Sequence, residues 1–367
     1  MEKKSIIGIT SIIIIGFSLI ITIPIVFLSI ALSPYGIIDD LLSFEYVPGS
    51  SSSIEKLNLN VDYGKIEIGY IFSPVDYYAK IDLKIEMIGV NLAGKSSTEF
   101  FNITWQDTSP TPSFTLQFKS SINKEETISL IKNINVFVTL RADITFDIIT
   151  TLNEGYFELF VPWGVSIGNA QTNVSIGNIL YDFEYCTIRG NITGTINNGD
   201  IFYDFNHCTI EGNITGIVNI GNIELTTLNA QYTRYCIWNF TIDNGKFDVF
   251  IYQYEDLGTN ITGKVHIRDG NVFVFYNDNS DNSGARFEIP FGNGFMNHNG
   301  FPQCVHETQE NITCTLVYGF EHNRIASDEG IIYFVSDDLL ANIVLFYYSI
   351  TFDIIQGSFD MELTSTN

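Results

Sequence analysis

The sequence predicts an all-β protein with an N-terminal transmembrane helix, an antiparallel β domain and a β-solenoid. Three observations lead to this prediction. Glycines recur every 22 residues from Gly155 to Gly221, strand-forming Ile, Phe, Tyr and Thr dominate after residue 40, and an uncharged run precedes them. A constant period of this length is typical of stacked units, because one such unit cannot bury its own apolar face.

The N-terminal run predicts a membrane span over residues 6–32. It carries no charge and is longer than the ~20 residues that cross a bilayer as a helix. Lys3 and Lys4 precede it, and Asp39 and Asp40 follow it. The positive-inside rule therefore predicts a cytoplasmic tip at residues 1–5 and an extracellular domain after the span.

A cleaved signal peptide is the alternative interpretation of the same run. Ser29-Ile30-Ala31 has the small-x-small pattern of a cleavage site. The run exceeds the usual apolar core of ~7–15 residues, so a retained single-pass anchor is favoured. Both interpretations export the rest of the chain, which places it at the cell membrane facing outward.

Residues 33–55 are expected to form a linker, since Pro48-Gly49 and four serines follow one another there. Residues 56–150 predict an antiparallel β domain. In Ala79–Met87 apolar and charged residues alternate strictly, as in a strand with one solvated side.

Residues 151–284 predict the β-solenoid. The second residue after each glycine is apolar, and Ile179, Ile201 and Ile223 share this position. In a coil that rises ~4.8 Å per rung, these three residues are expected to be vertical neighbours. Dipeptides such as Asn198-Gly199 predict turns with positive φ. An antiparallel sandwich of regularly spaced hairpins is the alternative.

Residues 285–367 are expected to cap the far end of the coil, because exposed ends invite edge pairing. The hexapeptide ITFDII occurs in this segment at 350–355 and also at 144–149. The two copies predict related strands.

The repeat motif resembles a known family. GNIL (177–180), GDIF (199–202), GNIEL (221–225) and GNVFV (270–274) are similar to the G-[DN]-[IV]-x-[VL] strands of a "putative adhesin" domain of unknown function. The resemblance covers roughly residues 150–290 and implies a β-solenoid fold. It also implies a role at the cell surface, although the motif consists of structural residues and does not carry a function by itself.

The formal net charge of −24 argues against nucleic acid as a partner, since a polyanion would repel this domain. The predicted partners are the cell membrane, through residues 6–32, and a glycan or surface-protein ligand. No cofactor is expected, and the sequence leaves the oligomeric state open.

Asn-x-Ser/Thr sequons make glycosylation another expectation. Asn102 and Asn311 lie outside the repeat, whereas Asn191 and Asn213 share a Gly-Asn position with Asn169, which suggests that the turn itself requires them. The seven sequon asparagines are Asn102, Asn173, Asn191, Asn213, Asn239, Asn260 and Asn311.

Five cysteines lie on the predicted exported side. Cys304 and Cys314 flank a short segment that a disulfide between them would close. Cys186 and Cys208 are 22 residues apart and are expected to be stacked, buried thiols, and Cys236 has no obvious partner.

No metal site is predicted. Cys304, His306, Cys314 and His322 lack the paired spacing of a zinc site. The polar segment 277–284 resembles a calcium loop, but its glycine comes one place late and the distant Glu is missing, which favours a plain turn.

Asp182 and Asp204 occupy the same outward position on successive rungs, and Glu184 is the next outward acid. These three residues predict an acidic stripe, in which a cation or sugar hydroxyls offset the repulsion between stacked carboxylates. Solvent screening of exposed acids is the alternative. No catalytic residue is predicted, because Asp147 and Asp353, which could act as a carboxylate pair, are explained as alternating polar strand residues.

These features favour a membrane-anchored, extracellular, adhesin-like glycoprotein that binds or scaffolds without catalysis. Abundant Ile, Asn, Phe and Tyr and a missing lipobox favour an archaeal source. The alternative functions are an extracellular carbohydrate-active β-helix enzyme and a regulatory subunit that senses envelope stress through a membrane partner.

Overall fold

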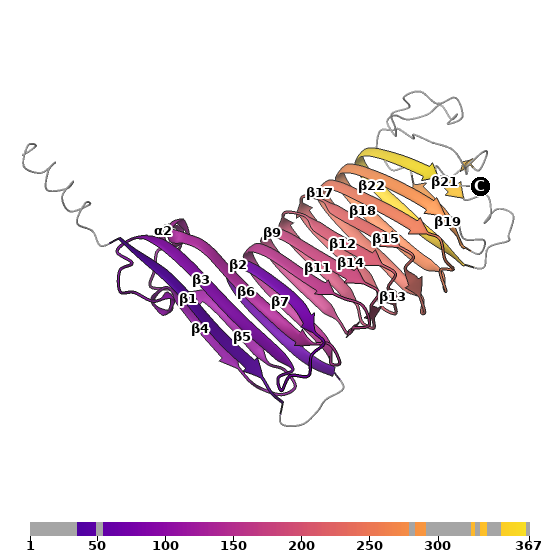
Figure 1. Cartoon of the computed structure of the whole chain (residues 1–367). Helices are drawn as coiled ribbons and strands as arrows, with labels where there is room; N and C mark the ends of the chain where they lie inside the picture. Colours follow the sequence, from indigo (N-terminus) through magenta and orange to yellow (C-terminus); the bar gives the residue numbers. More distant parts are fainter. Residues whose placement is uncertain are drawn as a thin grey trace, which may run out of the picture.

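The computed structural model describes residues 35–48, 54–278, 283–290, 324–326, 331–335 and 346–364. Within these ranges nearly all regular structure is strand, which confirms the all-β prediction (Figure 1). The described part also contains one α-helix, α2 (Lys124–Leu130), and one 3-10 turn, η1 (Ser97–Glu99). None of its helices has the length and apolarity to cross a bilayer, and the expected span at 6–32 lies outside the described residues.

The N-terminal part mixes parallel and antiparallel strands, so the prediction of an antiparallel domain over 56–150 is wrong in part. β3 pairs antiparallel with β1 and β6, and β4 pairs antiparallel with β5. In contrast, β2 runs parallel to β5, β6 and β7. The strands are β1 (Tyr35–Tyr46), β2 (Ile54–Ile71), β3 (Ala79–Val90), β4 (Phe101–Gln106), β5 (Ser113–Phe118), β6 (Ile131–Arg141) and β7 (Thr145–Val161).

The parallel pairs arise because β2 bends at Gly64 and contributes its two halves to two different layers. Residues 58–61 pair with β5, residues 65–71 pair with β6, and both halves pair with β7. β2 therefore resembles a rung of the coil more than a strand of a separate domain.

The expected linker at 33–55 is also corrected. Residues 35–46 form β1, which pairs with β3 from Tyr35 to Tyr46, and β2 already begins at Ile54. The reason is that Ile38 and Tyr46 point into the core, where each is at most 2% exposed. The energy of burying this side of the strand outweighs the flexibility suggested by the neighbouring Pro-Gly-Ser sequence.

Beyond β7 the chain forms stacked parallel rungs, here called the coil. A typical rung consists of β11, the bend at Gly199, β12 and the short β13. The short strands β8, β10, β13 and β16 form a sheet of their own. The strands are β8 (Ser166–Ile167), β9 (Ala170–Glu184), β10 (Thr187–Ile188), β11 (Ile192–Asn198), β12 (Ile201–Asn206), β13 (Thr209–Ile210), β14 (Ile214–Ile220), β15 (Ile223–Leu228), β16 (Gln231–Tyr232), β17 (Cys236–Gln253) and β18 (Ile261–Asp278).

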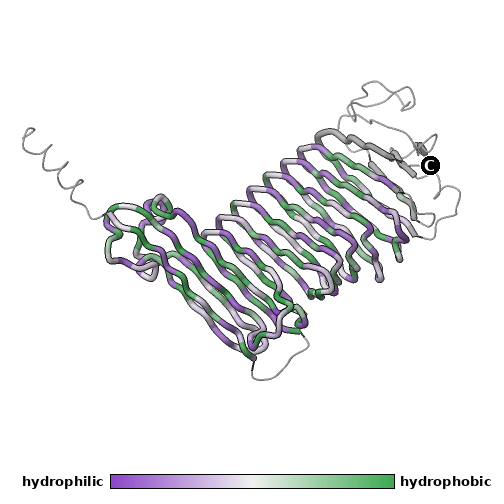
Figure 2. The backbone as a smooth tube through the Cα atoms, viewed as in Figure 1, coloured by the Kyte–Doolittle hydropathy of each residue, from purple (hydrophilic) through white to green (hydrophobic). Residues whose placement is uncertain are grey.

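The rungs stack in the predicted register. Ile201 pairs with Ile179 on one side and with Ile223 on the other, and all three are fully buried. Apolar and polar residues alternate along these strands, so one side of each faces the interior of the coil (Figure 2).

The glycines form a single column at one edge of the coil. Gly177, Gly199 and Gly221 have φ values of 139°, 136° and 134°. A Cβ atom on Gly199 would lie 1.6 Å from the carbonyl oxygen of Gly177, so the bend excludes any side chain. The column extends past the predicted limits of 151–284, because Gly64 pairs with Gly155 and Gly357 pairs with Gly270.

At the other end, the described part of the expected cap continues the coil. β22 runs parallel to β18 and to β19 and lies between them, although β19 precedes it in the chain. The strands here are β19 (Ser283–Pro290), β20 (Arg324–Ala326), β21 (Ile331–Val335) and β22 (Phe346–Thr364).

The two ITFDII copies do not occupy equivalent places, which corrects the expectation of related strands. Through successive pairings the column of Ile148 leads to Ile350, so the copies are offset by four residues. An even offset keeps the same side chains inward, and Phe146 and Phe352 are both 0% exposed.

Candidate functional site

The acidic stripe lies where the sequence predicts it. Asp182 of β9 pairs with Asp204 of β12, and Glu184 pairs with Asn206. Asp182 and Asp204 are half-buried, and Glu184 is exposed. The three carboxylates therefore share the outward side of two adjacent strands.

Apolar side chains surround these acids. Phe202 lies beside Asp204 in β12 and pairs with Leu180 of the previous rung and Glu224 of the next. Phe160 of β7 pairs with Asp182. Thus the stripe is a surface on which carboxylates and exposed apolar groups alternate, rather than a purely charged one.

This environment makes the stripe acids harder to ionise. Burial raises the pKa of Asp182, and the charges of Asp204, Glu184 and Glu158 raise it further. Burial also raises the pKa of Asp204, with a second contribution from Glu184. No lysine or arginine is among the groups that shift either pKa. These oxygens therefore favour hydrogen-bond donors that carry no negative charge.

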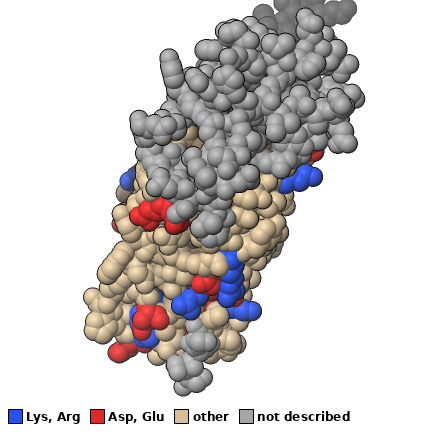
Figure 3. All heavy atoms as spheres, turned by 90° about the vertical axis from the view of Figure 1, so that its right-hand side faces the viewer, with Lys and Arg blue, Asp and Glu red and all other residues tan. Residues whose placement is uncertain are grey.

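On the side of the molecule in Figure 3, the coloured Lys, Arg, Asp and Glu side chains gather in small clusters on a mostly uncharged surface. The net charge of −24 therefore does not form a continuous acidic sheet on that side. A ligand of this surface meets local groups rather than a uniform negative potential.

The stripe ends at a corner built from residues with left-handed backbone. Gly164, Tyr185, His207 and Asn229 have φ values of 77°, 50°, 52° and 49°. The N–H groups of Gly164, Tyr185 and His207 each donate to a carbonyl of the next rung, at 2.7–3.0 Å. Left-handed backbone is uncommon for a residue as bulky as Tyr185, and such strain is often found at functional sites.

The side chains at this corner hold one another in place. The rings of Tyr185 and His207 stack with centroids 4.6 Å apart. His207 Nδ1 lies 2.6 Å from Asn206 Oδ1, and its Nε2 lies 3.1 Å from Asn229 Nδ2. The Tyr185 ring is thereby fixed from below while 47% of the residue remains exposed.

Two further exposed aromatic residues accompany Tyr185. Trp163 is 72% exposed and immediately precedes Gly164, which bonds to Tyr185, and Phe72 is 63% exposed. A cavity of about 530 Å³ is lined by Phe72, Gly164 and the Arg141–Asp143 ion pair, whose atoms are 2.6 Å apart. We call Phe72, Trp163, Tyr185 and His207 the aromatic corner.

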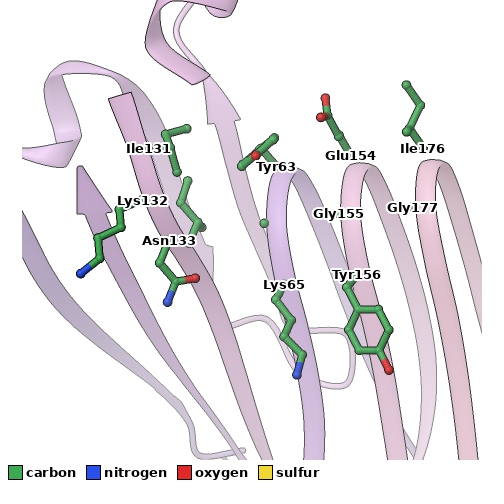
Figure 4. Close-up of a pocket in the computed structure, with 12 residues that line it drawn as sticks. Tyr63, Lys65, Ile131, Lys132, Asn133, Glu154, Gly155, Tyr156, Ile176 and Gly177 are labelled. Carbon is green, nitrogen blue, oxygen red and sulfur yellow. The ribbon is translucent and has the colours of Figure 1, made fainter. Parts of the chain in front are cut away.

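A second cavity of about 430 Å³ lies at the opposite edge of the strands, beside Gly64, Gly155 and Gly177 (Figure 4). Lys65 in its wall is paired with Glu67 at 2.7 Å and Glu158 at 3.2 Å. The cation is thus neutralised by the protein itself, and this cavity offers less unpaired chemistry than the aromatic corner.

The sequon asparagines have different environments. Asn102 on β4 and Asn239 on β17 are exposed, and Asn173 on β9 is half-buried. Asn260 Oδ1 accepts a bond from the N–H of Tyr347 at 3.0 Å. Asn311 lies outside the described residues.

Asn191 and Asn213 belong to a ladder that ties the rungs together, as their shared turn position suggested. Asn169 Oδ1 accepts the N–H of Asn191, and Asn191 Oδ1 accepts the N–H of Asn213, both at 2.9 Å. Asp147 Oδ1 begins the ladder by accepting the N–H of Asn169 at 2.7 Å. These side chains therefore have a structural role whether or not they are modified.

The cysteines of the coil are buried thiols, as expected. Cys186 and Cys208 stack with their Sγ atoms 3.4 Å apart, and Cys236 Sγ lies 3.0 Å from the carbonyl oxygen of Gly212. Cys304 and Cys314, the predicted disulfide, lie outside the described residues. Within the residues described, no three His, Cys, Asp or Glu side chains gather as a metal site would require.

Asp147 and Asp353 are not brought together. They belong to β7 and β22, which are six rung steps or roughly 29 Å apart along the coil. Carboxylate pairs that cleave glycosides stand within ~10 Å of each other. Asp353 Oδ2 instead lies 2.9 Å from His266 Nδ1 on the neighbouring strand.

Sequence reasoning missed the aromatic corner. The column contains Gly, Tyr, His and Asn, so no residue type repeats, and its first step is 21 residues rather than 22. The 22-residue frame applied to Tyr185, His207 and Asn229 was the available signal. All three residues follow an outward strand directly and therefore had to occupy one corner.

Comparison with known proteins gives no family assignment by sequence: no family profile and no curated protein matches the chain. Solved structures with some similarity include a "putative cell adhesion protein" from Clostridium sporogenes, 9% identical over 89% of this chain and 100% of that one, with a TM-score of 0.29. A "putative adhesin" from Bacteroides fragilis is 10% identical over 88% and 97%, with a TM-score of 0.30. Another from Parabacteroides merdae is 12% identical over 66% and 90%, with a TM-score of 0.27.

Proposed function

We propose that this chain is a membrane-anchored, adhesin-like surface protein whose rungs form a β-solenoid. It binds extended glycans along the acidic stripe and the aromatic corner, without catalysis. The cell membrane is its partner through residues 6–32, and the coil is extracellular.

The observation that carries the glycan proposal is the position of Trp163 and Tyr185 on adjacent rungs at the end of the acidic stripe. Aromatic faces stack on the C–H face of a sugar ring, and carboxylates accept bonds from its hydroxyls. Because Tyr185 is fixed by His207, little side-chain entropy is lost when a ring stacks on it. The half-buried acids Asp182 and Asp204 then accept hydroxyl protons in a partly apolar setting.

The test is binding of the full chain, in detergent, to a glycan array and to the best glycan in solution. Trp163→Ala and Tyr185→Ala should each weaken binding roughly 3- to 10-fold, the size of a lost aromatic contact. Phe137→Ala is the matched control, since Phe137 is also exposed, at 38%, but lies on β6 away from the corner. Negative arrays, or equal binding by all three variants, would contradict the proposal.

Glycosylation is a separate part of the proposal. Asn102 and Asn239 are the best candidates in the described part, because both side chains are exposed. Intact-mass spectrometry of the native protein before and after Asn102→Gln and Asn239→Gln would detect the loss of one glycan mass per variant. An unmodified mass in the parent would contradict it.

A further inference from the structure

The start of β1 carries an apolar surface that the function proposed above does not explain. Tyr35, Ile37 and Val90 are 65%, 66% and 46% exposed, and Ile88 is half-buried. Tyr35 pairs with Val90, and Ile37 pairs with Ile88. Because directly paired and next-but-one residues share a face of a sheet, the four side chains form one patch, here called the apolar tip.

The apolar tip has a sharp boundary. The next outward pair along the two strands is Asp39 with Glu86. Glu86 is also bonded to Lys84 at 2.6 Å and to Lys132 at 3.7 Å. The apolar stretch from Tyr35 to Ile37 therefore extends only about 7 Å along the strand before the surface becomes charged.

The tip is fixed to the rest of the fold from its first residue. Pairing with β3 begins at Tyr35 itself. On the other side, Gly36 packs so closely on Ala93 that an added Cβ would lie 2.2 Å from the backbone nitrogen. Asp40 Oδ2 also accepts the N–H of Ser97 at 2.7 Å. No flexible segment separates Tyr35 from the sheet.

The predicted span ends three residues earlier, at Leu32. A chain of that length reaches at most about 11 Å, so Tyr35 lies within that distance of the end of the span. A bilayer of ~40–45 Å with a hydrocarbon core of ~30 Å has an interfacial layer of about 5–7 Å in each leaflet. The apolar tip has the matching depth, and tyrosine is enriched in this layer.

We propose that the apolar tip lies in the headgroup layer of the bilayer that holds residues 6–32. This inference rests on the anchoring part of the proposed function. The partner is lipid, and the apolar side chains of the tip are covered by it rather than by a second protein. The sheet then meets the membrane directly, so the coil holds a fixed angle to the surface instead of swinging on a tether.

Quenching by brominated phosphatidylcholine tests this directly. The full chain is reconstituted in nanodiscs with Tyr35→Trp or, as matched control, Val47→Trp. Val47 is 51% exposed and follows the far end of β1, about 40 Å away. The emission of the native tryptophans is subtracted using the parent protein. Brominated lipid should remove most of the emission added at position 35 and leave that at position 47 unchanged.

Equal emission at both positions in brominated and ordinary lipid would overturn the inference. Ile37→Trp is a second probe of the same tip if Tyr35→Trp does not fold. Flotation of the parent with phosphatidylcholine vesicles separates the two proposals. A chain that fails to float overturns both the anchor and the tip, whereas a floating chain with an unquenched tip overturns the tip alone.

Discussion

The glycine column gives the sharpest prediction at the scale of single residues. Gly199→Ala would place a Cβ atom 1.6 Å from the Gly177 carbonyl oxygen at a φ of 136°. We expect a loss of roughly 3 kcal/mol or more in the free energy of unfolding, because strain and overlap add. Urea denaturation measures it.

Gly69→Ala is the control, since a Cβ there meets nothing within 4 Å and the φ is not positive. It should change stability by less than about 1 kcal/mol in either direction. Similar losses in the two variants would show that the glycine column is not what holds the bend.

The stripe acids predict an unusual pH dependence. Asp182 and Asp204 have raised pKa values when folded, so the folded state binds protons more tightly than the unfolded state. Their effect on stability is therefore favourable at low pH and is lost as the pH rises through the folded pKa values. As the pH falls from about 7 toward the ordinary value of 3.8, this part of the stability should increase.

The measurement compares melting temperatures of the parent and of Asp182→Asn/Asp204→Asn across this range. The variant should be more stable than the parent near pH 7, and the difference should shrink on acidification. A difference that grows as the pH falls would mean that these carboxylates are stabilised by cations rather than by protons.

At the scale of elements, the asparagine ladder links neighbouring strands through side chains. Asn191→Ala removes the acceptor for the N–H of Asn213 and should cost about 1 kcal/mol in chemical denaturation. Asn191→Asp should restore stability, because Asp147 already plays this part in the first step of the ladder.

Asn197→Ala is the matched control for the ladder. Asn197 makes a bond of 3.0 Å to Asn219, but between exposed side chains only. Its loss should fall within about 0.5 kcal/mol. An Asn191→Ala variant as stable as this control would contradict a structural role for the ladder.

The elements of the coil were readable from sequence, and those at its ends were not. Period-two alternation and a 22-residue frame place Ile179 on Ile201 without any long-range information. β1 was missed because Gly36 and Asp40 interrupt its alternation, and the contacts that hold it come from residues 92–97. The place of β22 between β18 and β19 is a choice among possible neighbours that no local pattern encodes.

The candidate site divides in the same way. The acidic stripe followed from the frame, since its members are carboxylates at equal spacing. The aromatic corner depends on which side chains a left-handed backbone exposes, and this is decided by neighbours such as His207 stacking on Tyr185. A sequence pattern that compares residue types cannot detect a column whose members share only a conformation.

At the scale of the whole molecule, the stacked register predicts which deletions are tolerated. Removing residues 178–199 joins Gly177 to Asp200, which has the same place in the rung as Asn178. The shortened coil should fold with a cooperative thermal transition, because each rung contacts only its neighbours. Removing 189–199 shifts the frame by half a rung and should abolish the transition. Far-UV circular dichroism on heating would show both results, and equal behaviour would contradict the register.

The position of β22 has a consequence for how the chain assembles. Strand β19 gains its parallel neighbour only when residues 346–351 reach it, more than 50 positions later in the chain. If the polypeptide emerges through the membrane from its N-terminal side, the growing stack must pause with the upper side of β18 open. Completion then requires a late segment to insert between two earlier ones, so the last part of the molecule to be delivered is also the part that closes it.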